Sequence, residues 1–293
     1  MYILIVNPVS GRGRSLELLP EIEAEFTRRG LPFRTERTSG AEEATSIARA
    51  AAAERADGIV AVGGDGCFFA VVNGVAGSDV PMLFVPCGTG NDFLKSLPLP
   101  KEPLAALRAQ LDAPLSRIDL GRMNDIHFLN VSGTGFDVDV LRCVDRHKEK
   151  HGGLLAYMLG LRDALKDYRP TEAHISFDGG PEERASFAIV SVGNGRYFGG
   201  GMRAVPDAKV DDGLFDAVVV KPVRKFMIPP LIAFFIAGLH IKLGFARLVR
   251  CKRFTLRRKD MTINLDGELF SADEANYELL PAALCVRLPG NNT

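Results

Sequence analysis

The strongest constraint on the fold of this chain is a repeated order in its first third. A short apolar run, a turn and a segment with helically spaced apolar residues follow one another. Strands are expected at residues 3–6, 33–38, 59–62 and 82–85, and helices at 15–29, 41–56 and 68–75. This alternation is typical of a mostly parallel, doubly wound α/β sheet. The runs Ile-Val-Ala-Val and Met-Leu-Phe-Val are apolar on both faces, which fits parallel strands covered by helices on both sides.

The pattern changes from about residue 124 onward. Short alternating runs occur at 127–131, 174–177, 188–192, 215–220, 253–257, 261–265 and 277–280. Turn sequences such as Asp-Gly-Gly at 178–180 separate them, and one helix at about 153–168 interrupts the series. These features predict an antiparallel β-sandwich or barrel-like domain. We therefore expect two domains, 1–122 and 123–293, with the last residues able to pack back on the first.

The composition excludes several classes of protein. Lys and Arg number 36 and Asp and Glu also number 36, so the formal net charge is zero, which argues against a nucleic-acid partner bound through bulk charge. Hydrophobic residues at 46% and charged residues at 25% are the balance of a globular protein. The five cysteines stand far apart, in neither a disulfide framework nor a zinc-ligand pattern, which predicts a reducing compartment.

The sequence shows no membrane-spanning segment and no signal peptide, which favours a cytoplasmic protein. The longest apolar run without an acidic residue, 226–239, would span about 21 Å as a helix, whereas the hydrocarbon core of a bilayer is roughly 30 Å thick. The N-terminal sequence lacks the basic leader and long apolar stretch of a signal peptide and is expected to form the first strand.

Charge is distributed unevenly along the chain. Residues 217–259 contain no Asp or Glu and eleven Lys or Arg residues, and the apolar run 226–239 lies inside this window. One interpretation is a buried helix followed by a strand with a solvated basic face. The other is a surface that makes peripheral contact with anionic lipid, where each Lys or Arg contributes ~1 kcal/mol. The two are compatible, because only one face of the helix need be buried.

Three turns rich in glycine follow the expected strands at the carboxyl edge of the sheet. In open α/β sheets, ligands bind at this edge. Glycine lets backbone N–H groups approach an anion closely, and the following helix N-termini favour negative charge, so a polyphosphate is the natural ligand. Neither a Walker A loop nor a GxGxxG sequence occurs, which disfavours a dinucleotide. The turns comprise Asn7, Pro8, Val9, Ser10 and Gly11; Gly63, Gly64, Asp65 and Gly66; and Gly88, Thr89, Gly90, Asn91 and Asp92.

At these residues the chain resembles the diacylglycerol kinase catalytic family, which includes bacterial soluble lipid kinases and sphingosine and ceramide kinases. The matching stretches, in the order of the family, are NPVSG at 7–11, GGDG at 63–66, VVNGV at 71–75, PCGTGNDF at 86–93, GFD at 135–137, the specific stretch 192–220, GLH at 238–240 and LDGE at 265–268. The resemblance implies a two-domain kinase of lipid metabolism and phospholipid biosynthesis. Its active site would lie in the cleft between the domains, where ATP phosphorylates a hydroxyl of a diacylglycerol-like membrane lipid.

The resemblance also implies roles for individual residues. Asp266 and Glu268 resemble the catalytic turn of the family, and one of the two carboxylates would remove the proton of the alcohol. Asp65 would lie near the ribose, the phosphates or a hydrated magnesium ion. Thr89 and Asn91 would contact the nucleotide, as would Thr38 at the end of the second strand. Cys67, which directly follows the second turn, is also expected to belong to the nucleotide site.

Magnesium is expected in two places. One Mg²⁺ should arrive with ATP, because phosphoryl transfer requires it. The stretch 209–214 resembles a loop in which bacterial relatives bind a structural magnesium ion. There the carbonyls of Lys209 and Leu214 and the carboxylate of Asp212 would be the ligands. The alternative is that Asp-Asp-Gly at 211–213 forms only a hairpin turn.

The sequence also departs from the family, which usually has Thr after GGDG and then an Asn-Glu pair. This chain has Cys67, Phe69 and Ala70 at those positions. Possible consequences are weaker ATP affinity, another donor, or a kinase-like protein that binds without catalysing. The retained DGE, GTGND and DDG elements favour catalysis.

The sequence does not name the acceptor. Diacylglycerol, ceramide-like, sphingoid and polyprenol-type alcohols all fit an apolar cleft. A kinase for a soluble alcohol, as in the distantly similar NAD and sugar kinases, is a further alternative. A homodimer through exposed sandwich edges is also compatible with the sequence.

Overall fold

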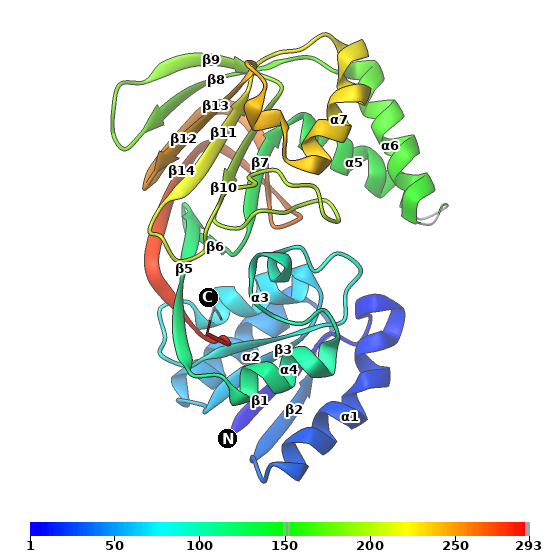
Figure 1. Ribbon diagram of the computed structural model, residues 1–293, viewed down its shortest axis with the longest axis vertical. Coiled ribbons are helices and arrows are strands. Elements are labelled where there is room, and N and C mark those ends of the chain that lie inside the picture. The colour runs from blue at the N-terminus through cyan, green and yellow to red at the C-terminus, as the bar shows by residue number, and fades with distance from the viewer. Residues whose placement is uncertain (149–150, 152, 291–293) are drawn as a thin grey trace.

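The computed structural model describes residues 1–148, 151 and 153–290. Figure 1 shows two bodies stacked along the long axis of the molecule, the N-terminal body at the bottom and the C-terminal body at the top. Strands β5 (Leu115–Met123) and β14 (Glu268–Arg287) run side by side along one edge and connect them.

The N-terminal body contains the expected parallel sheet. Its strands lie in the order β4-β3-β1-β2, and all three of these pairings are parallel. The strands are β1 (Tyr2–Val6), β2 (Phe33–Arg37), β3 (Gly58–Gly63) and β4 (Met82–Pro86). Every residue of β1, β3 and β4 is buried, which confirms the prediction from their uninterrupted apolar runs.

Helices cover both faces of this sheet because side chains alternate between the faces along each strand. Leu4, Val60 and Leu83 point to the side of α1 (Arg14–Arg28) and α4 (Pro103–Asp112). On the opposite face, Ile3, Ile59 and Phe84 pack against α2 (Ala41–Ala53) and α3 (Asp65–Val75). The doubly wound α/β arrangement predicted from the sequence is therefore confirmed. Helix α3 begins three residues earlier than expected, at the acid of the glycine-rich turn.

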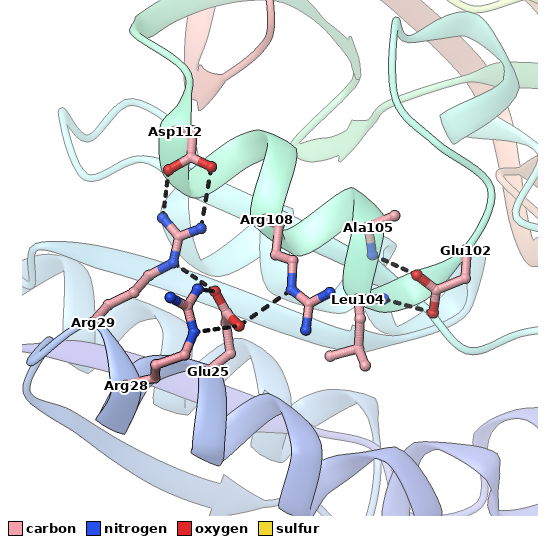
Figure 2. Close-up of polar contacts among 8 residues, drawn as sticks. All are labelled: Glu25, Arg28, Arg29, Glu102, Leu104, Ala105, Arg108 and Asp112. Atoms are coloured by element: carbon pink, nitrogen blue, oxygen red, sulfur yellow. Dashed lines mark hydrogen bonds and ion pairs between the residues drawn. The ribbon is translucent and has the colours of Figure 1, made fainter.

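An ion-pair network joins α1 to α4 on the outside of the sheet (Figure 2). Glu25 is buried and accepts hydrogen bonds from Arg28 and Arg29 of its own helix and from Arg108 of α4. Arg29 also binds Asp112 at the end of α4 with both guanidinium amino groups. Hydrogen bonds from Arg28 and Arg29 lower the pKa of Glu25 to about 2, so this carboxylate stays ionised and ties the two helices together.

The C-terminal body is an antiparallel β-structure, as predicted. Its pairings β7–β10, β10–β11, β11–β12, β13–β8 and β13–β14 are all antiparallel. Its strands are β6 (Ile126–Phe128), β7 (Val131–Gly135), β8 (Thr171–Phe177), β9 (Glu183–Phe187), β10 (Ile189–Gly193), β11 (Phe215–Val220), β12 (Ala246–Cys251) and β13 (Arg253–Leu265). The runs 253–257 and 261–265 form one strand, because β13 continues through an irregularity between Arg257 and Met261.

The helices of this body correct one expectation. The sequence predicted a single interrupting helix, which is α6 (Gly153–Asp167), but α5 (Phe136–Lys148) precedes it and packs against it. The apolar run 226–239 contains α7 (Ile228–Ala237). Short 3₁₀ turns lie at Ser10–Gly13, Phe93–Ser96, Lys225–Met227 and His240–Lys242.

Strand β14 positions the candidate site. It begins directly after the turn at Asp266 and Gly267, pairs with β13 and β5, and reaches β4 of the parallel sheet at the pair Val286–Met82. The β13–β14 turn, which contains Asp266 and Gly267, is therefore held in place by a strand that pairs with strands of both bodies.

Candidate active site

The three glycine-rich turns meet at the carboxyl edge of the parallel sheet. A Cβ atom added at Gly88 would lie 2.6 Å from the Cα of Gly64, so these two turns approach each other as closely as backbone allows. Gly11 has a φ of +61°, and a Cβ there would lie 2.0 Å from the carbonyl oxygen of Cys87. Only glycine fits such contacts, which explains its presence in each turn.

A cavity of about 650 Å³ extends from these turns into the C-terminal body. Its polar end is formed by Asp65, Thr89, Asp92, Asp266 and Glu268, which come from both bodies. The rest of its wall is mainly apolar and is formed by side chains of α5, α6, α7, β10 and β11, including Phe136, Val140, Val144, Leu161, Ile189, Val220, Ile232 and Phe235. The site thus combines an acidic end beside the turns with a long apolar compartment.

Asp65 lies in the first turn of α3, where the N–H of Phe93 donates a long hydrogen bond of 3.4 Å to its Oδ1. Burial and the neighbouring charge of Asp92 raise the pKa of Asp65 to about 6. A carboxylate with a pKa near neutrality is well suited to accept a proton from a bound alcohol.

Asp266 has a different environment. Its carboxylate accepts hydrogen bonds from the backbone N–H groups of Leu129 at 2.6 Å, Asn130 at 3.0 Å and Val131 at 3.0 Å. Burial raises the pKa of Asp266 to about 7, and the three N–H donors oppose this rise. Oδ1 accepts two of these bonds and Oδ2 accepts one, so Asp266 fixes the segment 129–131 that forms part of the cavity wall, while Oδ2 keeps a lone pair free.

Glu268 is exposed and extends toward the GGDG turn. Its Oε1 would lie 3.3 Å from a Cβ added at Gly66, beside Asp65. The two carboxylates of the predicted catalytic pair therefore differ in environment: both line the cavity, but Asp266 accepts three backbone N–H hydrogen bonds, whereas Glu268 is exposed.

Asp92 connects the nucleotide turn to the other body. It accepts a hydrogen bond from the Lys95 ammonium group at 2.6 Å and another from the backbone N–H of Gly200 at 2.7 Å. Lys95 brings a positive charge to the acidic end, where phosphate oxygens need cationic partners.

The other residues predicted for the nucleotide site do not line the cavity and instead shape the turns: Asn7, Pro8, Ser10, Gly11, Thr38, Gly63, Gly64, Cys67, Gly88 and Asn91. Thr38 is buried and donates to the carbonyl of Val6 at 3.4 Å. Asn91 donates to the carbonyl of Gly88 at 2.7 Å, which closes the third turn. Their roles toward a nucleotide stay predictions.

The sequence led us to expect an apolar cleft, but it did not identify the residues that form its wall or the polar residues within it. Asn130, Asp137 and Asn264 lie along the cavity, and none was predicted to be functional. The only signal was the GFD sequence at 135–137, which matched the family but carried no assigned role.

The loop predicted to hold a structural magnesium ion is already engaged by other groups. The guanidinium of Arg250 pairs with Asp212 and, at 3.0 Å, with the buried Asp216. The second carboxylate oxygen of Asp212 accepts the N–H of Leu214 at 3.2 Å. Within the described residues, no group of three or more His, Cys, Asp or Glu side chains is arranged to hold a metal ion. Lys209, Asp212 and Leu214 as ligands stay a prediction, and in this arrangement Arg250 supplies the positive charge.

This arrangement predicts a small metal dependence of stability. The melting temperature without nucleotide should differ by less than about 1 °C between EDTA and millimolar Mg²⁺, because a metal would have to displace Arg250. Arg250→Ala should lower the free energy of unfolding by about 1–3 kcal/mol, since it leaves Asp216 buried without its partner. Differential scanning calorimetry of both proteins measures these effects. A rise of several degrees on adding Mg²⁺ to the native protein would instead support the metal site.

Comparison with known proteins places this geometry in a family. Residues 1–123 match the model of the diacylglycerol kinase catalytic domain, and residues 130–288 match that of the YegS C-terminal NAD kinase beta sandwich-like domain. A diacylglycerol kinase of Mycobacterium tuberculosis is 30% identical over 97% of this chain and 94% of its own length. One of Bacillus subtilis is 32% identical over 90% of this chain and 88% of its own.

Solved structures agree with this grouping. A putative diacylglycerol kinase from Bacillus anthracis superposes with a TM-score of 0.81 at 26% identity, covering 100% of this chain and 96% of that one. An NAD kinase from Archaeoglobus fulgidus in complex with ATP shares the fold, with a TM-score of 0.54 at 12% identity over 98% of this chain and 93% of that one. The matches extend over both bodies, and this chain is therefore a kinase that belongs to the diacylglycerol kinase catalytic family.

Proposed function

We propose that this protein is an ATP-dependent lipid kinase that transfers the γ-phosphate to a hydroxyl of a diacylglycerol-like membrane lipid. The observation that carries the proposal is the cavity of about 650 Å³ with carboxylates at one end and an apolar wall along the rest. Such a cavity can hold acyl chains while it presents a hydroxyl to the acidic end. A soluble alcohol would leave most of this apolar wall without a partner, which makes that alternative the weaker one.

The chemistry follows from the positions of the turns and acids. The phosphates of ATP would lie against the backbone N–H groups of the three turns and the N-terminus of α3. Asp65 is our candidate for the general base: it would take the proton of the lipid hydroxyl while that oxygen bonds to the γ-phosphorus and ADP leaves. The ammonium group of Lys95 would lie near the phosphates and offset part of their negative charge. When bound with ATP, Mg²⁺ would neutralise phosphate charge, held by one or two of the carboxylates at this end together with phosphate oxygens.

Glu268 is the second candidate for the base. Both acids line the cavity, but Glu268 is exposed, whereas Asp266 already accepts three backbone N–H hydrogen bonds. We propose that Asp266 positions the segment 129–131. Glu268 would lie beside the acceptor hydroxyl and add negative charge there.

The residues that depart from the family face the protein interior. Cys67 is 4% exposed and Ala70 is 2% exposed, and both belong to the core beneath the parallel sheet. Phe69 packs against Phe270, with ring centroids 5.9 Å apart, in the core of the C-terminal body. None of the three lines the cavity, although Cys67 lies directly against Gly63 of the second glycine-rich turn. This supports retained catalysis over the alternative of a kinase-like binding protein.

An exposed apolar surface on and beside α7 supports a lipid substrate. Phe226, Met227, Phe234, Ile236 and Leu239 form this α7 surface, and their exposed fractions range from 39% for Met227 to 69% for Phe226. The other face of α7 lines the cavity. Exposed basic residues flank the surface at Lys221, Arg224, Lys225 and Lys242. This combination suits peripheral contact with an anionic membrane, with α7 between the lipid and the cavity.

No helix in the described part of the chain is both long and apolar enough to cross a membrane. A cytoplasmic location, peripheral membrane association and a homodimer stay proposals.

Incubation with radiolabelled ATP tests the proposed function. With Mg²⁺ and anionic vesicles that contain diacylglycerol, label should appear in a chloroform-soluble phosphorylated product. Mass spectrometry of products from a whole-lipid extract would identify the acceptor. Vesicles without a hydroxyl lipid serve as the control. Label that appears only in a water-soluble alcohol, or in no product while ATP still binds, would contradict the proposal.

A further inference from the structure

His240 is a histidine that the protein buries almost completely. It lies in the short turn His240–Lys242, just after α7, and is 1% exposed. It is also the last residue of the GLH sequence at 238–240, to which the proposed chemistry gives no role. Burying an imidazole costs free energy unless its polar atoms are paired, so a histidine in this position needs a structural or functional reason.

Two contacts hold the ring of His240. Its Nε2 donates a hydrogen bond to the backbone carbonyl of Ala204 at 3.0 Å, since a carbonyl only accepts. Its ring stacks on that of Phe235 in α7, with centroids 3.9 Å apart and an angle of 22° between the planes. Burial lowers the pKa of His240, so the ring is uncharged at neutral pH.

Both partners of His240 belong to parts of the chain that form the cavity, although His240 itself does not line it. Phe235 lines the cavity and packs edge to face against Phe198, which also lines it, with ring centroids 6.0 Å apart. Ala204 ends the segment 198–204. Four residues of this segment line the cavity: Phe198, Gly199, Gly200 and Met202.

The segment 198–204 depends on its contacts for its position. Its three consecutive glycines, at 199–201, have φ values of +60°, +86° and +119°, and glycine backbone has little stiffness of its own. The N–H of Gly200 donates to Asp92 of the third glycine-rich turn at 2.7 Å. At the other end, Ala204 is held by His240. The segment therefore connects the acidic end of the cavity with the end of α7.

We infer that His240 is a positioning residue for the acceptor lipid: it holds Phe235 and the segment 198–204 in the arrangement that the bound lipid contacts. The lipid would touch Phe235 and Phe198, whereas His240 would act through them. Its loss should weaken lipid binding and leave ATP binding, which uses the turns of the other body, unchanged. The inference rests on the proposed function and deepens it, because it gives the GLH sequence a role in acceptor binding.

Three substitutions separate the two contacts of His240. His240→Phe keeps a ring for Phe235 but has no donor for Ala204, His240→Gln keeps a donor but has no ring, and His240→Leu keeps neither. The first two should each raise the KM for a short-chain diacylglycerol, dissolved as monomers, by about two- to tenfold, the usual worth of one hydrogen bond or one aromatic pair. His240→Leu should raise it further. The kcat and the KM for ATP should stay within about twofold of the native values.

A role in folding alone predicts a different result. The active fraction would then fall, so kcat would decrease while both KM values stayed native. The Kd of a diacylglycerol with a fluorescent acyl chain, measured below the melting temperature of each variant, gives a readout without turnover and should follow the order of the KM values. His174→Leu is the matched control, because His174 lies in β8, outside the cavity, and its side chain is 55% exposed. It should change neither the KM nor the Kd for lipid.

The outcomes distinguish the inference from the proposed function. If the native protein phosphorylates lipids and His240→Leu keeps the native KM and Kd for lipid, the inference is wrong and the lipid kinase stands. A decrease in kcat alone, or an equal rise in the KM for ATP, would also overturn the inference. If the native protein phosphorylates no lipid at all, the proposed function fails and the inference fails with it.

Discussion

Asp65→Asn is expected to lower kcat by about 10²- to 10⁴-fold, the usual contribution of a general base. The amide keeps the size of the side chain but cannot take the proton of the acceptor hydroxyl. Stability should not fall at pH 8, because burial disfavours the ionised form of Asp65 and the amide carries no charge. Steady-state kinetics with saturating ATP and lipid, together with a thermal melt, measure both effects.

The pH profile gives an independent test of the same assignment. Only the ionised carboxylate can act as a base, so kcat of the native protein should rise with pH through about 6 and level off above it. In Asp65→Asn the remaining rate should lose this inflection.

Two matched variants identify the base among the three acids. Glu268→Gln should lower kcat less than Asp65→Asn. Asp266→Asn should mainly lower the free energy of unfolding. The amide NH₂ group of Asn would face one of the three backbone N–H groups that now donate hydrogen bonds to the carboxylate. If Glu268→Gln removes activity and the pH inflection while Asp65→Asn retains both, the base is Glu268.

The parallel sheet and its turns could be predicted from sequence because the relevant signals are local. A short apolar run followed by glycine and then by a helical pattern specifies a strand, a turn and a helix without reference to the rest of the chain. The close contact between Gly64 and Gly88 is not visible in the sequence, but both glycines follow neighbouring strands, and the topology brings such turns together.

Helix α5 could not be predicted in the same way. Its first residues, Phe-Asp-Val-Asp-Val at 136–140, alternate apolar and acidic side chains, which is the pattern of a half-buried strand. It follows β7 without a linker. Packing against α6 decides the conformation, and the acids of the first turn are compatible with the helix N-terminus. The wall residues that α5 contributes to the cavity were missed together with this helix.

The different roles of Asp266 and Glu268 also depend on contacts that are distant in sequence. The N–H groups that bind Asp266 belong to residues 129–131, more than 130 positions earlier in the chain. A motif shows that two acids are close to each other but not which one accepts hydrogen bonds from a distant part of the backbone. For the same reason, the pairing of Arg250 with the 211–213 turn lay outside what the sequence could show.

The second large effect is expected on the α7 surface. Phe226→Ser combined with Ile236→Ser removes two side chains that are 69% and 51% exposed. Together they should contribute about 2–3 kcal/mol to membrane binding, since full burial of one such side chain is worth about 1.5–3 kcal/mol. The double variant should therefore bind anionic vesicles roughly 30- to 150-fold more weakly. Vesicle co-sedimentation measures this, and added salt should weaken the binding of both proteins by screening the flanking Lys and Arg residues.

The double substitution should leave the rate of phosphoryl transfer in the cavity unchanged. Membrane contact and catalysis can therefore be measured separately. A short-chain diacylglycerol dissolved as monomers reaches the cavity without a bilayer, so the double variant should phosphorylate it at close to the native rate. Leu115→Ser is the matched control, because Leu115 is 60% exposed but lies in β5, outside the α7 surface. It should leave vesicle binding unchanged. If the double variant sediments with vesicles as well as the native protein does, α7 is not the surface that meets the lipid, and the route from membrane to cavity must lie elsewhere.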